Sequence, residues 1–542
     1  MFTNILIVGA GPTGLMLANQ LGRRGIATTI IDRHSGPAQQ SRAMAVHART
    51  LEIYAKLGIA DRAVELGRPG NGGNIWSGGR HRARIPFTEM GKDLSAFPYV
   101  LMLGQDDNER LMGDLLTHWG ISVQWNTELI GLEQRPDSVV ATIKTAEGTV
   151  RTITAAYVAG CDGSRSAVRD MCGISFPGAA YEHSFFVADT EATGPMVPDE
   201  LNVFLWGSGF HLYFPMRGEN CWRVIGILPR DLSARDHLTF EQLLPTLLHR
   251  GAPGLTFTAC HWFSTYRIQH RCTERFRDRR CFLLGDAAHV HSPMGGQGMN
   301  TGLQDAYNLA WKLALVVNHH ADDTLLDTYE AERRPFALQL LATTDRAFQT
   351  VVSDNWLTGL LRTKVIPRLA AFAMRRAAVR RAAFLTLSQI GIRYRDSALS
   401  RTLDGVNADG PQAGDRFPWL KLKFHPQDAR DDLFRRMDDT RFNLLAIGQA
   451  APDLPAAWAD ALKVHRIPAD VNAHELAAAS ITSPSYYLLR PDGHIALAGR
   501  VFEEGALIQW FADASVRLPR ATDARASQAS DGLTRETHRV EV

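Results

Sequence analysis

The glycine-rich turn near the N-terminus constrains the fold of this chain more than any other feature. It reads Gly9-Ala10-Gly11-Pro12-Thr13-Gly14 and directly follows a short apolar run over residues 5–8. A helical period of apolar residues follows the turn, and a second β-rich run over residues 27–31 ends at Asp32. Alternating strand and helix signals of this kind indicate a parallel α/β sheet. Residues 4–32 are therefore predicted to form a βαβ unit.

The residue types in this unit are those that a dinucleotide site needs. Gly9 permits a tight turn, Gly11 lets the backbone approach a pyrophosphate, and Gly14 lets the helix pack closely on the strand. The N–H groups at the helix start face the negative charge of the ligand. Asp32 lies 18 residues beyond Gly14, where its carboxylate can accept hydrogen bonds from ribose hydroxyls. The residues predicted to bind the dinucleotide here are Gly9, Gly11, Pro12, Thr13, Gly14, Asp32 and Arg33.

A second glycine loop lies far along the chain and helps to choose between FAD and NAD, which the first unit leaves open. Residues 281–284 form an apolar run that ends in Gly285-Asp286, and a loop over residues 293–302 holds four further glycines. An amphipathic helical pattern begins in that loop, so a second helix N-terminus can face another part of the same extended ligand. A simple NAD dehydrogenase has no evident need for this loop, and FAD is therefore favoured.

A third motif, Cys161-Asp162-Gly163-Ser164-Arg165-Ser166, completes a pattern that points to one family. Together the three separated motifs resemble those of single-component, FAD-dependent aromatic monooxygenases of the para-hydroxybenzoate hydroxylase fold. The phenol hydroxylase-like subgroup, which has a C-terminal thioredoxin-like domain, is the most similar. The resemblance covers nearly the whole chain.

The resemblance implies roles for the later motifs. Asp286 would lie near the ribityl chain and pyrophosphate of FAD, and the backbone of residues 298–300 would face the flavin pyrimidine ring. Asp162-Gly163 would serve both FAD and NAD(P)H. Arg42 would lie near the isoalloxazine, and Gln105 matches a glutamine that contacts the flavin. The further residues that the resemblance assigns to cofactor binding are Arg42, Gln105, Asp162, Gly163, Arg165, Gly285, Asp286, Pro293, Gly298, Met299 and Asn300.

The predicted fold class is α/β, with a Rossmann-type FAD-binding domain, an inserted antiparallel-sheet substrate domain and a C-terminal thioredoxin-like domain. The inserted sheet is predicted from short segments rich in Phe, Trp, Tyr and Val that turn signals separate. Every cysteine lies at or before Cys281, so the C-terminal domain cannot be a dithiol oxidoreductase, and a structural or dimer-forming role is expected. The predicted segments are 1–180 and 276–400 for the FAD-binding domain with its helical region, 181–275 for the sheet, 401–520 for the thioredoxin-like domain and 521–542 for a disordered tail.

Charge and cysteine usage exclude several classes of protein. Lys and Arg number 59 against 57 for Asp and Glu, so no excess of positive charge favours nucleic acid. No run of about 18 apolar residues suggests a membrane-spanning helix, and no N-terminal signal pattern is seen. The six cysteines form no C-x-x-C pair, which favours a reducing, cytoplasmic compartment. His289 and His291 lack further ligands, so no metal is expected.

The predicted activity is that of an NAD(P)H- and FAD-dependent hydroxylase of a phenolic or other electron-rich aromatic substrate. The resemblance implies that NADPH or NADH reduces FAD and that O2 then forms a C4a-hydroperoxyflavin. Some phenol hydroxylases have an aspartate where this chain has Met44, so His47 is a candidate replacement for the base. The aromatic sheet is the predicted roof of the substrate site, with His211 and Tyr213 as candidate catalytic residues.

Several alternatives stay open at this point. A related flavin enzyme could act on a polyketide or another non-simple ring, by epoxidation or oxygen insertion. A flavin halogenase is disfavoured because no Trp-x-Trp-x-Ile-Pro segment is found. A remoter alternative is a non-catalytic nucleotide-fold binding protein, which would not be yellow. The substrate, the choice between NADH and NADPH, and the oligomeric state, for which a homodimer is the candidate, are not determined by the sequence.

Overall fold

The computed structural model describes residues 2–38, 43–206, 209–233, 237–251, 253–292, 294–352, 359 and 361–519. The predicted tail, 521–542, lies outside these residues. The chain divides into two compact units, each built from two chain segments. The first unit comprises Met1–Tyr307 and Arg333–Ile390, and the second comprises Asn308–Glu332 and Gly391–Val542.

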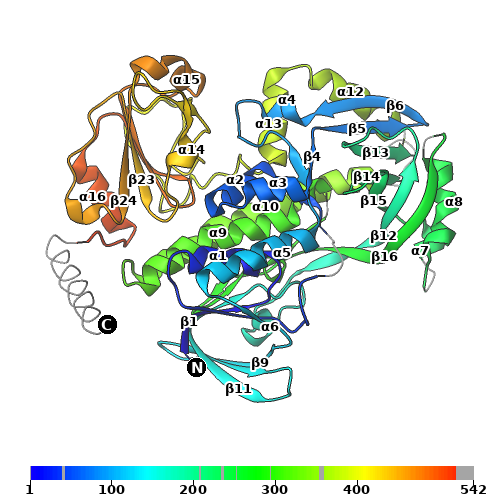
Figure 1. The fold of residues 1–542 in the computed structure, drawn as a ribbon, viewed down its shortest axis with the longest axis horizontal. Coiled ribbons are helices and arrows are strands. Elements are labelled where there is room, and N and C mark those ends of the chain that lie inside the picture. Colours follow the sequence, from blue (N-terminus) through cyan, green and yellow to red (C-terminus); the bar gives the residue numbers. More distant parts are fainter. Residues whose placement is uncertain are drawn as a thin grey trace, which may run out of the picture. The chain divides into compact units, whose positions relative to one another are not determined.

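A mostly parallel sheet lies at the centre of the first unit, in the order β17-β18-β11-β1-β2-β8; β1, β9 and β11 are labelled in Figure 1. Strand β17 is antiparallel to β18, and β10 and β9 join β11 by antiparallel pairing. Strand β1 pairs in parallel with β2 and β11, and β11 pairs in parallel with β18. The interior of β1 is buried on both faces, as in sheets that helices cover on both sides. Because these strands run in one direction, the loops that follow them meet at one edge of the sheet. The bounds are β1 (Phe2–Val8), β2 (Thr28–Ile31), β8 (Val123–Gln124), β9 (Glu128–Gln134), β10 (Val139–Lys144), β11 (Val150–Gly160), β17 (Arg277–Asp278) and β18 (Cys281–Leu283).

The predicted βαβ unit is confirmed, because helix α1 (Pro12–Gly22) connects β1 to β2. The first unit contains further helices and a small three-stranded sheet. They are α2 (Ala48–Leu57), α3 (Ala60–Leu66), α4 (Phe87–Gly91), α5 (Gln105–Leu116), α6 (Ala167–Met171), α12 (Ile366–Ala373), α13 (Ala377–Leu387) and the small sheet β3 (Ala45–Val46), β7 (Val100–Met102) and β4 (Arg68–Gly70). Helices α9 (Gly298–Val317) and α10 (Asp327–Val352) follow the second glycine loop.

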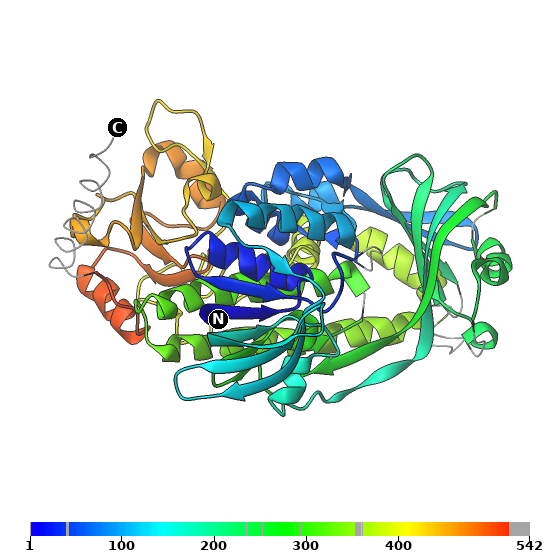
Figure 2. The same cartoon turned by 60° about the horizontal axis from the view of Figure 1, so that its bottom comes forward.

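A second, curved and mostly antiparallel sheet belongs to the first unit, in the order β19-β16-β12-β15-β14-β13-β5-β6 (Figure 2; β12 to β16 are teal to green, and β5 and β6 are blue). Helices α7 and α8 cover one face of this sheet (Figure 1). A core rich in aromatic residues packs between the helices and the sheet. The bounds are β5 (Gly72–Ser77), β6 (Arg80–Pro86), β12 (Gly178–Thr193), β13 (Leu201–Trp206), β14 (Gly209–Pro215), β15 (Cys221–Ile227), β16 (Thr256–Cys272), β19 (His289–Val290), α7 (Arg230–Ser233) and α8 (Phe240–Arg250).

The inserted antiparallel sheet is thus confirmed, and it recruits strands from outside the aromatic segment. Strand β13 pairs in parallel with β5, which comes from the N-terminal part of the chain. Pairing between strands so far apart leaves no local signal, so the sequence could not indicate it. The exact segment boundaries stay predictions.

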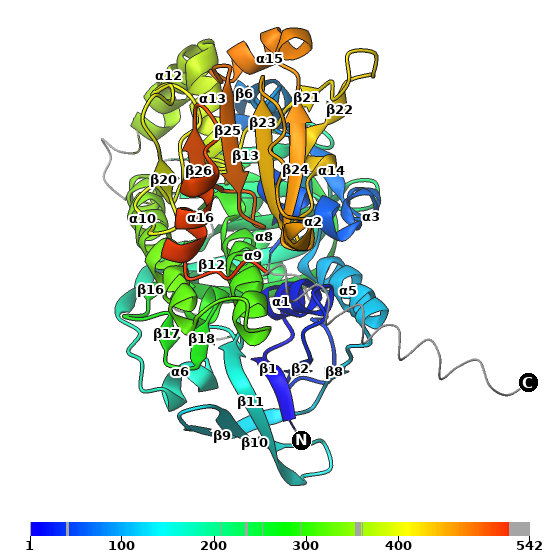
Figure 3. The ribbon, with the colours of Figure 1, turned by 90° about the vertical axis from the view of Figure 1, so that its left-hand side faces the viewer.

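The second unit holds a thioredoxin-like sheet in the order β20-β26-β25-β23-β24 (Figure 3). Strand β24 is parallel to β23, whereas β25 is antiparallel to both β23 and β26. An apolar core lines this sheet and includes the buried strand interiors. The bounds are β20 (Arg401–Thr402), β21 (Lys421–Leu422), β22 (Asp431–Asp432), α14 (Leu433–Arg436), β23 (Phe442–Ile447), β24 (Leu462–Ile467), α15 (Ala473–Ala478), β25 (Ser485–Leu489), β26 (Ile495–Gly499) and α16 (Glu504–Asp513).

Among the described residues, no helix combines the length and the apolar character that crossing a membrane requires.

Candidate functional site

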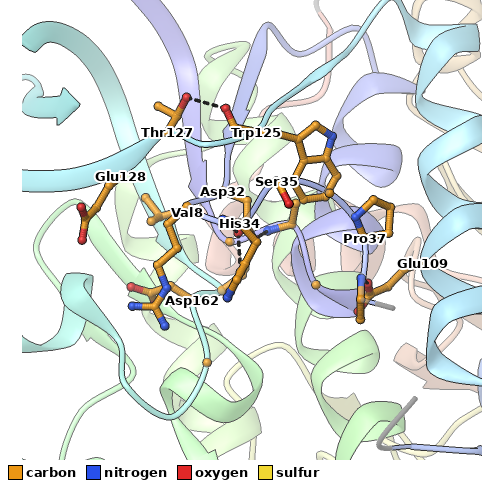
Figure 4. A pocket seen from close by; sticks show the side chains of 18 of the residues that line it. Val8, Asp32, His34, Ser35, Pro37, Glu109, Trp125, Thr127, Glu128 and Asp162 are labelled. Atoms are coloured by element: carbon orange, nitrogen blue, oxygen red, sulfur yellow. Dashed lines mark hydrogen bonds and ion pairs between the residues drawn. The ribbon is translucent and has the colours of Figure 1, made fainter. Parts of the chain in front are cut away.

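A cavity of about 990 Å³ lies where the loops after the parallel strands meet (Figure 4). Loops after β1, β2, β11 and β18 contribute to its walls, together with the start of α5. The structure therefore brings together residues from three motifs that are far apart in the sequence. The predicted cofactor residues that line the cavity are Gly9, Gly11, Asp32, Arg33, Gln105, Asp162, Gly163, Arg165 and Asp286.

The three glycines of the first turn have different reasons to be glycine. Gly9 has a φ of +102°, and a Cβ there would lie 2.3 Å from the carbonyl oxygen of Cys161. A Cβ on Gly14 would lie 2.0 Å from the carbonyl oxygen of Gly9. A Cβ on Gly11 would meet nothing within 4 Å, because this position faces the open cavity. Packing thus requires the outer two glycines, while the middle one leaves the backbone accessible to a ligand.

Helix α1 starts directly at this turn. Pro12 is its first residue, and its N-cap Gly11 makes no side-chain capping bond, so N–H groups at the helix start can face a ligand. The hydroxyl of Thr13 packs against the Gly285 turn, since a Cβ on Gly285 would lie 2.7 Å from it. Pro12, Thr13, Gly14 and Gly285 do not line the cavity and instead hold its loops in place.

Asp32 is held rigidly at the end of β2. One carboxylate oxygen accepts the N–H of Ala10 at 2.7 Å, and the other accepts the N–H of His34 at 2.8 Å. The His34 Nδ1 also lies 2.8 Å from the latter oxygen. Because the carboxylate lines the cavity from this fixed position, it is placed to accept further hydrogen bonds from a ligand.

Asp162 is a buried carboxylate that the protein satisfies only in part. Its Oδ2 accepts the N–H of Val168 at 3.1 Å. Its Oδ1 is buried and has no hydrogen-bond partner among the described residues. Burial raises the pKa of this carboxyl above its ordinary value. Unsatisfied buried oxygens are costly, so a ligand hydroxyl or N–H that reached Oδ1 would be stabilised.

Gln105 lines the cavity and forms hydrogen bonds to the neighbouring segments of the chain. Its side-chain Nε2 donates to Glu109 Oε1 at 2.8 Å, and Glu109 Oε2 accepts the N–H of Ala38 at 2.7 Å. Burial raises the pKa of Glu109. The N–H of Gln105 donates to the carbonyl of Ala43 at 3.0 Å, so the 103–105 segment is tied to the 43–44 segment.

The Asn300 side chain connects the start of α9 to residues 45–50 by hydrogen bonds. It accepts the N–H of His47 at 2.9 Å and the hydroxyl of Thr50 at 2.8 Å, and it donates to the carbonyl of Ala45 at 2.7 Å. Met299 accepts a hydrogen bond from the Asn108 amide at 3.3 Å. Gly298, Met299 and Asn300 do not line the 990 Å³ cavity, and the predicted residues Arg42 and Pro293 lie outside the described residues.

A buried ionic cluster behind the Gly285 turn is a feature that sequence reasoning missed. Asp305 Oδ2 accepts the N–H of Gly285 at 3.0 Å and lies 2.8 Å from His289 Nε2, while Oδ1 lies 2.6 Å from Arg333 Nε. Arg333 also donates to the carbonyl of Thr301. Burial alone would raise the pKa of Asp305, but Arg333 and His289 outweigh it and lower the pKa. The one available signal was an acidic residue within an apolar helical pattern.

A second cavity of about 340 Å³ lies between the FAD-binding part and the curved sheet. Met44, Met102 and Gly104 line one side. On the other side Arg223 and Asp189 form a bidentate ion pair, with both N–O distances at 2.6 Å. The Arg223 side chain is only 1% exposed, and its guanidinium lies 5.4 Å from the ring centroid of Trp262. Further charged side chains of both signs line this cavity together with His261, so its wall combines ionic, aromatic and apolar groups; they include Arg68, Asp106, Asp107 and Arg217.

Of the three predicted catalytic residues, His47 lies apart from His211 and Tyr213, and none of the three lines either cavity. His47 is the N-cap of α2, where burial lowers its pKa to about 4 against a smaller opposite effect of the Gly295 and Gly296 backbone. His211 and Tyr213 lie on β14 in the apolar core that α8 covers. Burial lowers the pKa of His211 and raises that of Tyr213. Their catalytic roles stay predictions, and this placement does not support those of His211 and Tyr213.

Comparisons with known proteins match the chain almost from end to end. The FAD binding domain family matches residues 2–344, and the C-terminal domain family of aromatic-ring hydroxylases matches residues 410–514. A 6-methylpretetramide 4-monooxygenase from Streptomyces rimosus is 33% identical over 508 residues, which covers 92% of this chain and 90% of the relative. Pentachlorophenol 4-monooxygenase from Sphingobium chlorophenolicum is 33% identical over 471 residues, covering 85% and 82%.

A solved structure agrees with these relatives. The anhydrotetracycline hydroxylase OxyS from Streptomyces rimosus superimposes with a TM-score of 0.75 at 28% identity, over 96% of this chain and 100% of that chain. The family matches cover the glycine turn, the Asp162-Gly163 motif and the Gly285-Asp286 motif on which the resemblance rested. The chain therefore belongs to the FAD-dependent aromatic monooxygenases of the para-hydroxybenzoate hydroxylase fold.

Proposed function

We propose that FAD binds in the 990 Å³ cavity and that the aromatic ring to be oxygenated binds in the 340 Å³ cavity. One observation carries this proposal: the two cavities lie on either side of one wall. Gln105 lines the first cavity and Gly104 the second, and backbone hydrogen bonds join this segment to Ala43 and Met44. A cofactor and a ring that occupied the two cavities would meet at this wall.

The residues of the larger cavity fit FAD. The uncapped start of α1 and the accessible backbone at Gly11 suit a pyrophosphate, and Asp32 suits a ribose. The unpartnered Oδ1 of Asp162 needs a hydrogen-bond donor, which the cofactor or NAD(P)H has in its hydroxyl and amide groups. When bound and reduced by NAD(P)H, FAD supplies the oxygen chemistry, with O2 as the oxidant. The chain binds and orients the reactants and keeps water away from them.

The smaller cavity favours a compact phenolic substrate. Its volume of about 340 Å³ lies at the low end of the roughly 300–1,000 Å³ range of ligand pockets. The opposite charges of the Arg223–Asp189 pair balance each other, and the ring of the neighbouring Trp262 at this cavity could pack against an aromatic substrate. A multi-ring polyketide is the second candidate, because the relatives include a 6-methylpretetramide 4-monooxygenase and an anhydrotetracycline hydroxylase.

A screen of ring compounds tests this function. Single-ring phenols and polycyclic phenols are added to the FAD-loaded protein without oxygen, and the rate of flavin reduction by NADH and by NADPH is followed at the flavin absorbance. We expect a compact phenol to accelerate reduction and to yield a product one oxygen atom heavier in air. A colourless protein that binds no FAD, or a set of ring compounds none of which accelerates reduction, would contradict the proposal.

Replacement of Asp286 by alanine is expected to weaken FAD binding. Asp286 lines the cavity, and a charge-assisted hydrogen bond to the cofactor would contribute about 1.5–3 kcal/mol, so the dissociation constant should rise by roughly tenfold or more. Flavin fluorescence on dilution measures this directly. Asp137→Ala, which removes an exposed carboxylate elsewhere in the first unit, serves as the control. Equal FAD affinity in both variants would show that Asp286 does not contact the cofactor.

We infer a cytoplasmic location, which is supported by the six cysteines, since they form no disulfide among the described residues and reducing compartments disfavour disulfides. A homodimer stays a prediction, for which light scattering of the purified protein is the measurement.

A further inference from the structure

The second unit contains a basic cavity that the flavin chemistry does not use. Its volume is about 600 Å³, and it lies along the edge strand β24 and helix α14. Four permanently positive side chains line it, against one carboxylate, that of Asp470. They are Arg435 and Arg436 on α14 and Lys463 and Arg466 on β24. The whole chain is nearly balanced, with 59 basic and 57 acidic residues, so this cavity is a local concentration of positive charge.

Two of the four cations are held in place by the protein. Arg436 pairs with Asp431 at 2.7 Å and lies 4.4 Å from the ring centroid of Phe424. Lys463 donates to the carbonyl of Arg436 at 2.8 Å, so no carboxylate neutralises it in this contact. Arg435 and Arg466 are exposed and form no ion pair with any described residue. The cavity therefore carries positive charge at Arg435 and Arg466 that no carboxylate among the described residues balances, while Arg436 and Lys463 are held in position by their contacts.

Protection of the sheet edge accounts for only part of this pattern. Lysine and arginine on an edge strand prevent it from pairing with another chain, which would explain Lys463 and Arg466. Arg435 and Arg436 lie on a helix, where no strand edge needs protection, yet they line the same cavity. Positive groups gathered around one hollow repel one another, and a bound anion relieves that repulsion.

We propose that this cavity binds a small polyanion that carries adjacent phosphate groups. Guanidinium groups form paired hydrogen bonds with phosphate oxygens, and a ligand with two or more negative charges can engage cations from both walls at once. The unit contains no cysteine, so thiol chemistry is excluded as the role of this cavity. The polyanion is either a free polyphosphate or the phosphate groups of a nucleotide. The site is independent of the proposed flavin function.

The test measures binding of pyrophosphate to the FAD-loaded full chain by titration calorimetry. We expect saturable binding of one pyrophosphate, weakened by added salt, and at least tenfold weaker binding in Arg435→Gln/Arg466→Gln. The control variant Lys421→Gln/Arg500→Gln removes two exposed charges of the same unit that do not line the cavity, and should bind like the original chain. ADP titrations of the FAD-loaded chain separate the sources, because ADP has adjacent phosphates and cannot reduce the flavin. Loss of ADP binding together with pyrophosphate binding in the double variant indicates a nucleotide, and loss of pyrophosphate binding alone indicates a free polyphosphate.

Two results would overturn the proposal. One is the lack of saturable pyrophosphate binding to the original chain. The other is an equal loss of affinity in the control variant, which would show attraction to general surface charge. If the double variant aggregates because the edge strand is less protected, Arg435→Gln alone keeps β24 intact. We then expect at least fivefold weaker pyrophosphate binding, and unchanged affinity would again overturn the proposal.

Discussion

Replacement of Asp305 by alanine should lower the free energy of unfolding by about 3–5 kcal/mol and release FAD, because removing one partner of a buried ion pair leaves the other charge poorly compensated. Asp305, Arg333 and His289 are almost fully buried, and Asp305 also holds the N–H of Gly285. Its loss should therefore disturb the turn that places Asp286 at the cavity. Urea unfolding of the FAD-loaded protein measures the stability, and flavin fluorescence measures the release.

Two further variants separate the contribution of the Asp305 charge from that of its packing and from general surface effects. Asp305→Asn keeps the shape of the side chain but not its charge, so an intermediate loss is expected. Asp114→Asn changes an exposed carboxylate of the same unit and should alter stability by no more than about 0.5 kcal/mol. FAD retention in Asp305→Ala is also measured at excess cofactor. Normal retention there indicates a lower stability alone, whereas continued loss of FAD indicates a displaced turn. A stability within 1 kcal/mol of the original chain would refute the role of this cluster.

The pH dependence follows from the direction of the shift. The pKa of Asp305 is lower in the folded than in the unfolded protein, so the unfolded state binds more protons in acid. Its contribution is complete above the ordinary aspartate pKa and is lost as the pH falls through the lowered value. The difference between the original chain and Asp305→Ala should therefore be constant at neutral pH and shrink in acid.

Local chemistry explains why the cofactor turn could be predicted from the sequence. Gly14 is required by the carbonyl of nearby Gly9, and Gly9 by its positive φ of +102° in the tight turn, while the apolar runs on either side reveal the strands. The contact of Gly9 with Cys161 arises only in the folded chain. The Asp305 cluster has no such signal, because its partners are 16 and 28 residues away and meet only in the folded chain. The hydrogen bond from the His47 N–H to the Asn300 side chain joins residues 253 apart in the chain, so the sequence could not indicate it either.

The residues of the curved sheet that line the smaller cavity were harder to predict than the cofactor turn, and the reason is geometric. Side chains along a strand alternate between the two faces of a sheet, and both faces of the curved sheet carry aromatic residues. The sequence therefore could not tell which face α8 covers. Tyr213 lies on the covered face, whereas Arg223 and Trp262 line the smaller cavity. A polar pair such as Arg223 and Asp189, directly opposite on β15 and β12, became visible only through strand pairing.

The second unit contains a fully buried ionic network. Glu332 Oε1 lies 2.5 Å from Arg490 Nη1, and Glu332 Oε2 lies 2.9 Å from Lys312 Nζ. Asp492 lies 2.5 Å from Arg490, and the Ser397 hydroxyl donates to Glu332 at 2.7 Å. Buried carboxylates that accept several charged donors are costly to remove, because those donors have already lost their water. The network joins chain segments before and after residue 390 into one unit.

Replacement of Glu332 by alanine is expected to lower the free energy of unfolding by about 3–5 kcal/mol at pH 7. Burial alone would raise the pKa of Glu332, but Arg490 and Lys312 outweigh it and lower the pKa from 4.5 to about 2. Its contribution is therefore complete above pH 4.5 and disappears as the pH falls toward 2. Urea unfolding at pH 7, 5 and 3 measures this, with the exposed Asp404→Asn as control. A difference that stayed the same at pH 3 would show that packing, and not charge, explains the loss.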